Sequence, residues 1–175
     1  MARDKVVYAT QTRPQTGSIT RRNWLQLAGF GAAAMLASVA AAVLEKLKLS
    51  DKEWRQRLTP EQYYILRKAG TEPAGSSPLD KEYGEGEYRC AGCDLLLFTS
   101  AMKYNSGTGW PSFFAAVDDH IETELDFKLI WPRTEYHCAR CGGHQGHVFE
   151  DGPAPTGERY CMNSAAMRLD RDTAE

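Results

Sequence analysis

The sequence predicts a mainly β protein in which two short helices precede a compact antiparallel β-sheet domain with a structural zinc site. Two capping boxes, the second followed by a glycine stop, indicate the helices. Short runs rich in apolar and aromatic residues, separated by Gly- and Pro-rich turns, indicate the strands. Two CxxC pairs among these runs indicate a metal ion that joins strands distant in sequence. Helices first and strands afterwards is an order typical of this architecture.

Length and charge limit the function classes. A chain of 175 residues fits one domain of ordinary size plus a tail. The net charge of -2 hides an asymmetry, because residues 1–22 carry an excess of +4 and leave -6 on the remainder. An acidic body is a poor surface for phosphates, so we expect no nucleic-acid partner.

The first 45 residues have the features of an export signal. Residues 23–44 are uncharged and rich in Ala, Gly and Leu, and they follow a basic segment. Arg21 and Arg22, within residues 20–26, resemble the twin-arginine signal that the export machinery recognises. We therefore expect residues 1–45 to be a signal or membrane anchor and residues 46–175 to be the functional domain, periplasmic or anchored facing the periplasm. The alternative is a cytoplasmic protein with an amphipathic N-terminal helix.

Two short helices are expected at 51–57 and 60–69. Ser50 with Glu53, and Thr59 with Gln62, match the capping box, and a proline occupies the first position of the second helix. Gly70 follows at the distance expected of a helix stop. Residues 71–86 are rich in Gly, Pro and Ser and predict a linker.

The clearest strand lies near residues 121–129. Apolar and β-branched residues at odd positions alternate there with charged residues at even positions, which predicts a strand with one wet face. Further strands are expected around Tyr88, 95–98, Tyr136, 148–149 and 159–162.

Four cysteines in two CxxC pairs predict a tetrahedral zinc site formed by Cys90, Cys93, Cys138 and Cys141. The 44 residues between the two pairs exceed the spacing of common zinc ribbons. Two disulfides or a redox-active pair are the alternatives in an exported protein. A CxxC disulfide closes so small a loop that it constrains the unfolded chain little, which favours one structural zinc ion per chain.

The fifth cysteine, Cys161, has no CxxC partner and is the candidate nucleophile. Arg159 and Asn163 are each two residues away, hence on the same face of a strand. A cation at Arg159 is expected to lower the pKa of the thiol, and Asn163 is expected to donate a hydrogen bond. His144 and His147 are candidate acid–base groups. Spacing does not show that the histidines meet the thiol.

A glycine-loosened loop at 105–114 ends in aromatic residues. It is either a wedge in the core or an apolar cup for a small group, with Trp110 as the wall. His120, in a turn, and His137, beside a CxxC pair, are expected to be structural.

Together these segments resemble the methionine-R-sulfoxide reductases, the MsrB family, from about residue 51 to residue 169. The segments that carry the resemblance are 53–55, 58–63, 88–93, 106–114, 133–135, 138–149 and 151–164. The resemblance implies a β-tent-like sheet domain and thiol-dependent reduction of methionine-R-sulfoxide in proteins, and of the free amino acid. Its implied partners are oxidised proteins and a thioredoxin-like or small-thiol reductant.

The resemblance also assigns roles to individual residues. Cys161 attacks the sulfoxide sulfur and is left as a sulfenic acid. A histidine protonates the departing oxygen, because that oxygen leaves poorly until it is protonated. The implied assignments are acid catalysis by His147 with His144 beside it, orientation of the thiol by Arg159 and Asn163, and substrate binding by Trp110 and Phe149.

This sequence departs from many family members at Thr108, where they place a second, resolving cysteine. With four cysteines on zinc, no partner is left for an intramolecular disulfide, so an external thiol is expected to reduce the sulfenic acid.

Two other function classes compete with this interpretation. One is an exported zinc-knotted binding module in which Cys161 only packs. The other is a metal hydrolase with His144 and His147 as ligands, which lacks a third ligand at suitable spacing and an HExxH motif.

Overall fold

The structure is a computed structural model that describes residues 44–127 and 131–171. The predicted signal segment lies outside these ranges except for its last two residues. Across the described ranges, none of the helices combines the length and apolar character that a membrane crossing requires.

Both predicted helices are confirmed, as α1 (Asp51–Arg57) and α2 (Pro60–Lys68). Each begins with a complete capping box, from Ser50 and from Thr59. The second ends one residue earlier than predicted, because Ala69 adopts the left-handed conformation that closes the helix.

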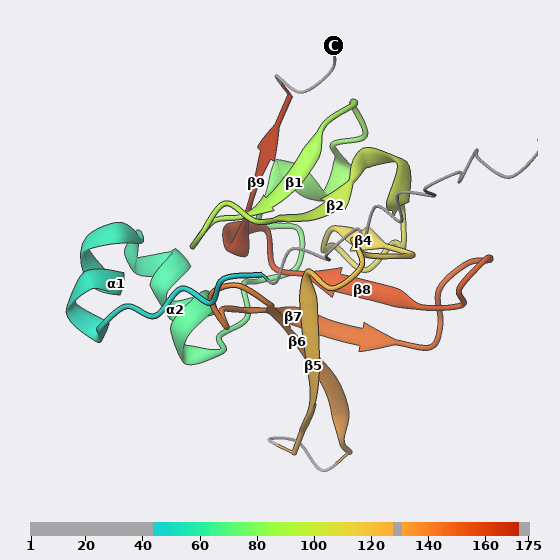
Figure 1. The fold of residues 1–175 in the computed structure, drawn as a ribbon. Coiled ribbons are helices and arrows are strands. Elements are labelled where there is room, and N and C mark those ends of the chain that lie inside the picture. Colours follow the sequence, from blue (N-terminus) through green and yellow to red (C-terminus); the bar gives the residue numbers. More distant parts are fainter. Residues whose placement is uncertain (1–43, 128–130, 172–175) are drawn as a thin grey trace, which may run out of the picture. The chain divides into compact units, whose positions relative to one another are not determined.

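Two antiparallel sheets form the body of the domain (Figure 1). The smaller sheet has the strand order β2-β1-β9, and the larger has the order β3-β4-β8-β7-β6-β5. The strands are β1 (Glu87–Cys90), β2 (Leu96–Thr99), β3 (Lys103–Tyr104), β4 (Ser112–Phe113), β5 (Ile121–Asp126), β6 (Arg133–Cys138), β7 (His144–Phe149), β8 (Arg159–Met162) and β9 (Met167–Asp170). The described residues also form three short 3-10 turns, η1 (Pro78–Lys81) before β1, η2 (Ser100–Met102) and η3 (Ser164–Ala166).

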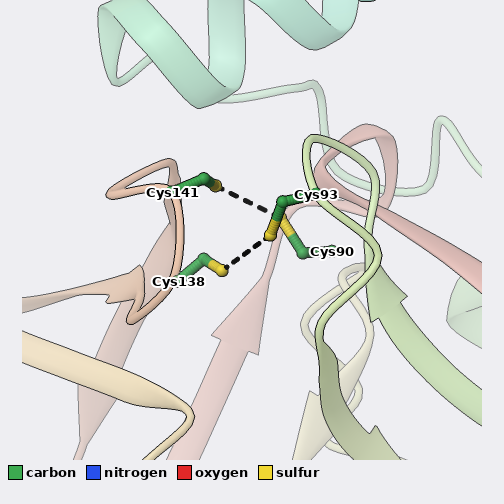
Figure 2. A group of neighbouring side chains, drawn as sticks. All are labelled: Cys90, Cys93, Cys138 and Cys141. Atoms are coloured by element: carbon green, nitrogen blue, oxygen red, sulfur yellow. Dashed lines mark hydrogen bonds between the residues drawn. The ribbon is translucent and has the colours of Figure 1, made fainter. Parts of the chain in front are cut away.

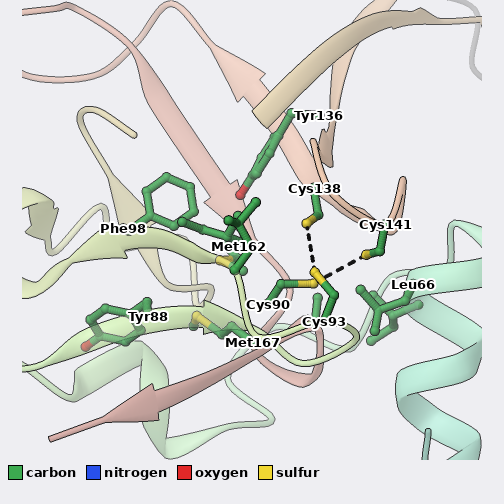
Figure 3. Close-up of a cluster of buried hydrophobic side chains, with 14 of the residues drawn as sticks. Leu66, Tyr88, Cys90, Cys93, Phe98, Tyr136, Cys138, Cys141, Met162 and Met167 are labelled. Carbon is green, nitrogen blue, oxygen red and sulfur yellow. Dashed lines mark hydrogen bonds between the residues drawn. The ribbon is translucent and has the colours of Figure 1, made fainter. Parts of the chain in front are cut away.

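Aromatic side chains fill the core between the sheets (Figure 3). Phe98 of β2 stacks on Phe113 of β4 with ring centroids 4.2 Å apart. Tyr136 of β6 meets Phe98 edge-on at 6.2 Å. Burying each such ring contributes on the order of 1.5–3 kcal/mol, so these contacts hold the two sheets together.

The strand at residues 121–126 is confirmed, but the prediction that its apolar face is buried was wrong. Leu125 and Phe127 are 62% and 71% exposed, whereas Asp126 is 5% exposed. The reason is position, because β5 is the edge strand of the larger sheet and its hairpin with β6 extends away from the smaller sheet (Figure 1). On the other face Glu122 and Glu124 are exposed too, and only Asp126 is buried, among polar partners described next.

Candidate active site

Cys161 lies on an inner strand of the larger sheet, between two paired neighbours. It is directly opposite His147 on β7 and directly opposite Ser112 on β4. Glu135 on β6 is in turn opposite His147. Directly opposed residues share a face of the sheet, with Cβ atoms about 5 Å apart. The pairing therefore brings the candidate nucleophile and a candidate acid–base group together, which spacing in the sequence could not show.

A β-bulge places both candidate histidines on this face. His144 and His147 are three residues apart, so a regular strand would turn them to opposite faces. The register shifts here: His137 pairs with His144, whereas the residue before His137 pairs with Gly146, leaving Gln145 as the extra residue. As a result the rings of His144 and His147 lie 5.5 Å apart between centroids.

The bulge requires glycine at position 146. A Cβ atom on Gly146 would lie 1.9 Å from the carbonyl oxygen of Cys161, which is far inside van der Waals contact. Only a residue without a side chain lets β7 approach β8 this closely.

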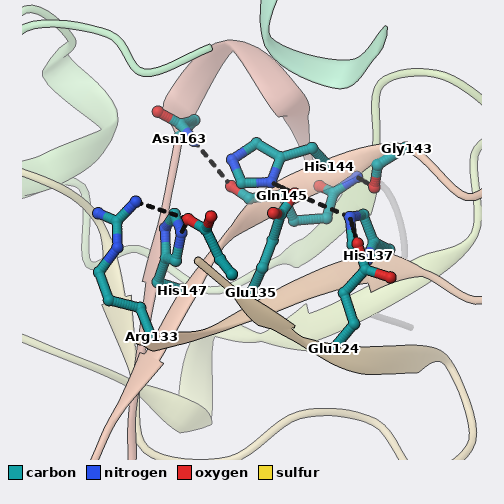
Figure 4. Close-up of polar contacts among 10 residues, drawn as sticks. Glu124, Arg133, Glu135, His137, Gly143, His144, Gln145, His147 and Asn163 are labelled. Carbon is teal, nitrogen blue, oxygen red and sulfur yellow. Dashed lines mark hydrogen bonds and ion pairs between the residues drawn. The ribbon is translucent and has the colours of Figure 1, made fainter. Parts of the chain in front are cut away.

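Each histidine is bonded to a carboxylate (Figure 4). Nδ1 of His144 lies 2.5 Å from Oε1 of Glu135, and Nε2 of His147 lies 2.9 Å from Oδ2 of Asp126. Arg133 donates to the same Asp126 oxygen at 2.7 Å. A carboxylate accepts hydrogen bonds, so the bonded nitrogen of each ring carries the proton. Nδ1 of His147 and Nε2 of His144 are left as the basic atoms.

Burial keeps both imidazoles neutral near pH 7. It lowers the pKa of His144 to about 4, although Glu135 acts in the opposite direction. It also lowers the pKa of His147, against the hydrogen bond to Asp126. Neither histidine is therefore a charged acid before substrate arrives.

A cavity of about 250 Å³ surrounds Cys161 and brings most of the predicted site residues together. Its lining includes Trp110, His147, Phe149, Cys161 and Asn163. The cysteine itself is only partly buried. The loop at 105–114 thus supplies a wall of the cavity through Trp110, as the cup interpretation expected.

The prediction of a lowered thiol pKa was wrong in its net direction. Burial raises the pKa of Cys161, although the charge and hydrogen bonding of Arg159 and a hydrogen bond with Thr108 lower it. Arg159 is held in place by Asp151, with nitrogen–oxygen distances of 2.7 and 2.8 Å, and by stacking 4.3 Å above the ring of Phe149. The cation is present as predicted, but desolvation outweighs it.

Asn163 connects two segments beside the thiol. Its Nδ2 donates to the carbonyl oxygen of Gln145 at 3.0 Å, as Figure 4 shows. Its Oδ1 accepts from the backbone N–H of Glu72 at 3.2 Å. The side chain therefore ties the bulge of β7 to the linker after α2.

Three acidic residues of the site were missed by sequence reasoning. Asp126 and Glu135 each hold a histidine, and Glu72 contacts two cavity-lining residues. Asp126 stood on the strand face expected to be wet, and Glu72 stood in a linker without any pattern. A carboxylate's histidine partner depends on strand pairing, which a single sequence does not display.

The four cysteines of the CxxC pairs converge as predicted (Figure 2). Their sulfur atoms lie within 4.8 Å of one another, with Cys90–Cys141 at 3.7 Å and Cys93–Cys138 at 3.4 Å. Four sulfurs bound at 2.3 Å to one tetrahedral ion would be about 3.8 Å apart. The distances therefore fit four ligands of a metal ion, and they exceed the roughly 2.05 Å of a disulfide.

The cluster connects the two sheets. Cys90 ends β1 of the smaller sheet and Cys138 ends β6 of the larger one. Arg67 of α2 donates to the carbonyl oxygen of Cys141 at 3.1 Å, so the helix is attached to the same point. Hydrogen bonding among the crowded sulfurs raises the pKa of Cys90 and Cys138 and lowers that of Cys93 and Cys141, so the four thiols share protons among themselves. Four thiolates at this site need a cation to neutralise them.

The distances within the histidine–carboxylate groups argue against the metal-hydrolase alternative. Glu135, His137 and His144 form one group with donor atoms close together, and Asp126, Glu135 and His147 form another, so a third donor does exist. However, Glu135 lies 2.8 Å from His137 and 2.5 Å from His144. Two ligands bound at 2.1 Å to one ion are about 3 Å or more apart, so these are hydrogen-bonded pairs that share protons.

The neutral state of His144 predicts a loss of stability in mild acid. The unfolded histidine takes up a proton near pH 6.5, whereas the folded one does so only at about pH 4. Between these values the unfolded state binds more protons, so the free energy of unfolding should fall by about 3 kcal/mol as the pH is lowered. Urea unfolding of wild type and His144→Gln across this range checks it. In the variant the free energy of unfolding should depend less steeply on pH, while the protonation of other groups contributes equally to both proteins. Identical dependence on pH in the two proteins would contradict a neutral, buried His144.

The chain is similar in sequence to a known domain family and to several known proteins. The SelR domain family matches residues 58–171. "Peptide methionine sulfoxide reductase B1, chloroplastic" of Arabidopsis thaliana is 51% identical over 126 residues, which are 71% of this chain and 62% of that protein. The protein of the same name from Oryza sativa subsp. japonica is 51% identical over 69% of this chain and 57% of its own length. This chain thus spans less than two thirds of either plant protein. "Peptide methionine sulfoxide reductase MsrB" of Leptospira interrogans is 50% identical over 70% of this chain and 95% of its own length.

Proposed function

Because the chain belongs to the SelR family, which is the methionine sulfoxide reductase B family, we propose that it reduces methionine-R-sulfoxide in proteins to methionine. The observation that carries the proposal is the placement of Cys161 opposite His147, inside a cavity walled by Trp110. The choice of the R epimer follows from the family. A small cavity suits a methylsulfinyl side chain presented by a polypeptide.

The thiol itself supplies the proton that the reaction needs. Burial raises the pKa of Cys161, so near neutrality the sulfur holds its proton, and the residue opposite it on β7 is a neutral His147. His147 takes the thiol proton and transfers it to the sulfoxide oxygen as the sulfur attacks, while Asp126 stabilises the transient imidazolium. The attack forms a bond between the two sulfur atoms as the sulfoxide S–O bond breaks and the oxygen leaves as hydroxide. Hydroxide or water then adds to the sulfur of Cys161, the S–S bond breaks, methionine is released and Cys161 becomes a sulfenic acid. Thiol plus sulfoxide gives sulfenic acid plus sulfide, so no further proton is consumed.

Neighbouring side chains orient the substrate and the thiol of Cys161 for this reaction. Trp110 offers an apolar surface for the substrate methyl group, and Phe149 lies on the same face of the sheet as His147. Arg159, fixed between Asp151 and Phe149, places a positive charge near the sulfur. That charge favours the developing thiolate during attack. Asn163 holds the bulge that aims the histidines.

A second thiol must come from outside the chain. Four of the five cysteines are gathered in the buried cluster. Two external thiols, or one dithiol such as a thioredoxin-like protein, convert the sulfenic acid at Cys161 back to the thiol and release water.

We further propose that the four-cysteine cluster holds one structural Zn²⁺. Soft thiolates in a closed four-ligand site suit zinc, and the sulfur separations support this metal. The ion would contribute folding energy and take no part in the chemistry.

Export remains a proposal from the sequence. The basic residues ahead of an uncharged apolar segment, with two adjacent arginines, support a twin-arginine route to the periplasm. The protein would then meet oxidised proteins in that compartment, either released or anchored.

Turnover of the two methionine sulfoxide epimers with dithiothreitol tests the function. We expect reduction of the R form and no reduction of the S form. The alternative of a binding module without catalysis is tested by mass spectrometry after exposure to the R epimer. The enzyme gains one oxygen, or a thiol adduct, at Cys161, and an unchanged mass of this residue would favour the binding module.

Replacing Thr108 by cysteine should create an intramolecular resolving thiol. The side chain of Thr108 is connected to the strand beside Cys161: its hydroxyl is hydrogen-bonded to Ser106, which is bonded to Ser112, the residue opposite Cys161 on β4. After one turnover without external reductant, Thr108→Cys should contain two fewer free thiols than before, because a disulfide joins positions 108 and 161. Thr108→Ser is the matched control and should lose only the thiol of Cys161. Loss of only one thiol in the cysteine variant, as in the control, would contradict this geometry.

A further inference from the structure

A buried acid lies in the linker after α2, where the sequence gives no sign of function. Glu72 is 6% exposed, although its neighbours in the linker are mostly exposed. Burying a carboxylate is costly unless hydrogen bonds compensate for the lost water. Its partners therefore indicate what the residue does.

The carboxylate of Glu72 is fixed by two backbone groups immediately after Asn163. Oε1 accepts from the N–H of Ser164 at 2.7 Å, and Oε2 accepts from the N–H of Ala165 at 3.1 Å. Charge-assisted bonds of this kind are stronger than neutral ones. They fix the peptide unit of Glu72 to the segment that directly follows β8.

The backbone of the same residue contacts two walls of the cavity. The carbonyl oxygen of Glu72 accepts from Nε1 of Trp110 at 3.1 Å. Its N–H donates to Oδ1 of Asn163 at 3.2 Å. Thr71, the preceding residue, lines the cavity around Cys161 together with both of them.

We propose that Glu72 is a positioning residue that sets the orientation of Trp110 over Cys161. The carboxylate anchors the linker, the linker carbonyl holds the indole N–H, and the indole ring forms the wall that receives the substrate methyl group. This inference rests on the proposed function for the role of the indole ring. The hydrogen bonds themselves do not depend on that function.

The test compares Glu72→Ala, Glu72→Gln and Thr59→Ala. Alanine removes both acceptors, whereas glutamine keeps one acceptor oxygen and presents an NH₂ group to the other N–H. We expect KM for methionine-R-sulfoxide to rise roughly 10-fold in Glu72→Ala, and less in Glu72→Gln, because the indole is no longer held over the substrate. Alkylation of Cys161 by iodoacetamide should change little in either variant.

Thr59→Ala removes the N-cap of α2 and serves as the stability control. It should lower the melting temperature without changing KM, because a merely structural defect reduces the amount of folded enzyme. If Glu72→Ala does not fold, Glu72→Gln carries the test. An unchanged KM in those Glu72 variants that fold would overturn the proposal while leaving the reductase function intact.

A second readout needs no substrate. Hydrogen exchange of the Trp110 indole N–H, followed by NMR, should accelerate in the Glu72 variants and stay unchanged in Thr59→Ala. If the wild type fails to reduce sulfoxide, the proposed function is wrong, but exchange still reports whether Glu72 holds the indole. Equal exchange rates in the wild type, Glu72→Ala and Glu72→Gln would show that Glu72 does not hold the indole of Trp110.

Discussion

Replacing Cys161 by serine is expected to abolish reduction of methionine-R-sulfoxide, with a loss of at least about 10³-fold in kcat. A hydroxyl is a much weaker nucleophile than a thiol, and it cannot form a sulfenic acid that a reductant recycles. Rates with dithiothreitol for both proteins, at saturating substrate, measure the effect.

The fold should survive this substitution, which makes it a clean test of chemistry. Cys161 is partly exposed and lies outside the four-cysteine cluster. Serine is nearly isosteric, so the melting temperature and metal content should match the wild type. Cys161→Ser that turns over sulfoxide at the wild-type rate would refute the nucleophile assignment.

Replacing Cys138 by serine is expected to unfold the domain at room temperature, or to lower its melting temperature by tens of degrees. Structural zinc contributes on the order of 10–16 kcal/mol in zinc-finger peptides, as much as the whole stability of a typical domain. Cys138 ends β6 while Cys90 ends β1, so losing this ligand releases one sheet from the other. Circular dichroism melting curves, with and without a strong chelator, measure the loss.

Metal analysis and mass spectrometry complete that experiment. The wild type should contain one zinc per chain, and Cys161→Ser should contain the same amount. Two disulfides instead of a metal would lower the mass by about 4 Da and would leave the protein insensitive to chelators. That outcome would replace the metal proposal with the disulfide alternative.

Local signals explain which parts of the fold were predictable. The capping boxes at Ser50 and Thr59 act within one helical turn, so the sequence displays them directly, and both helices begin where expected. The CxxC turns are equally local, and each turn brings two thiols together. Their convergence followed from the coordination number of the metal, which demands four ligands.

The remaining features depend on pairing between strands. The burial of side chains along β5 was misjudged, because alternation shows that a strand has two faces but does not show which residues are buried. Asp126 is buried by Arg133 and His147. The bulge at Gln145 decides that His144 lies on the same face of the sheet as His147, and a bulge is a property of two paired strands. The pKa of Cys161 also required the fold, since charge is visible in the sequence and desolvation is not.

The position of Cys161 in the sheet determines how an external reductant can reach it. β8 is hydrogen-bonded to β4 on one side and to β7 on the other, and Cys161 pairs with a residue of each. Moving the backbone of Cys161 outward would break both ladders, so we expect the oxidised cysteine to be reduced where it stands. In the proposed function, a reductant would therefore bring its own thiol into the cavity that Cys161 lines. Under the proposed function, repair of a client protein and reduction of the sulfenic acid would both take place in this cavity, one after the other.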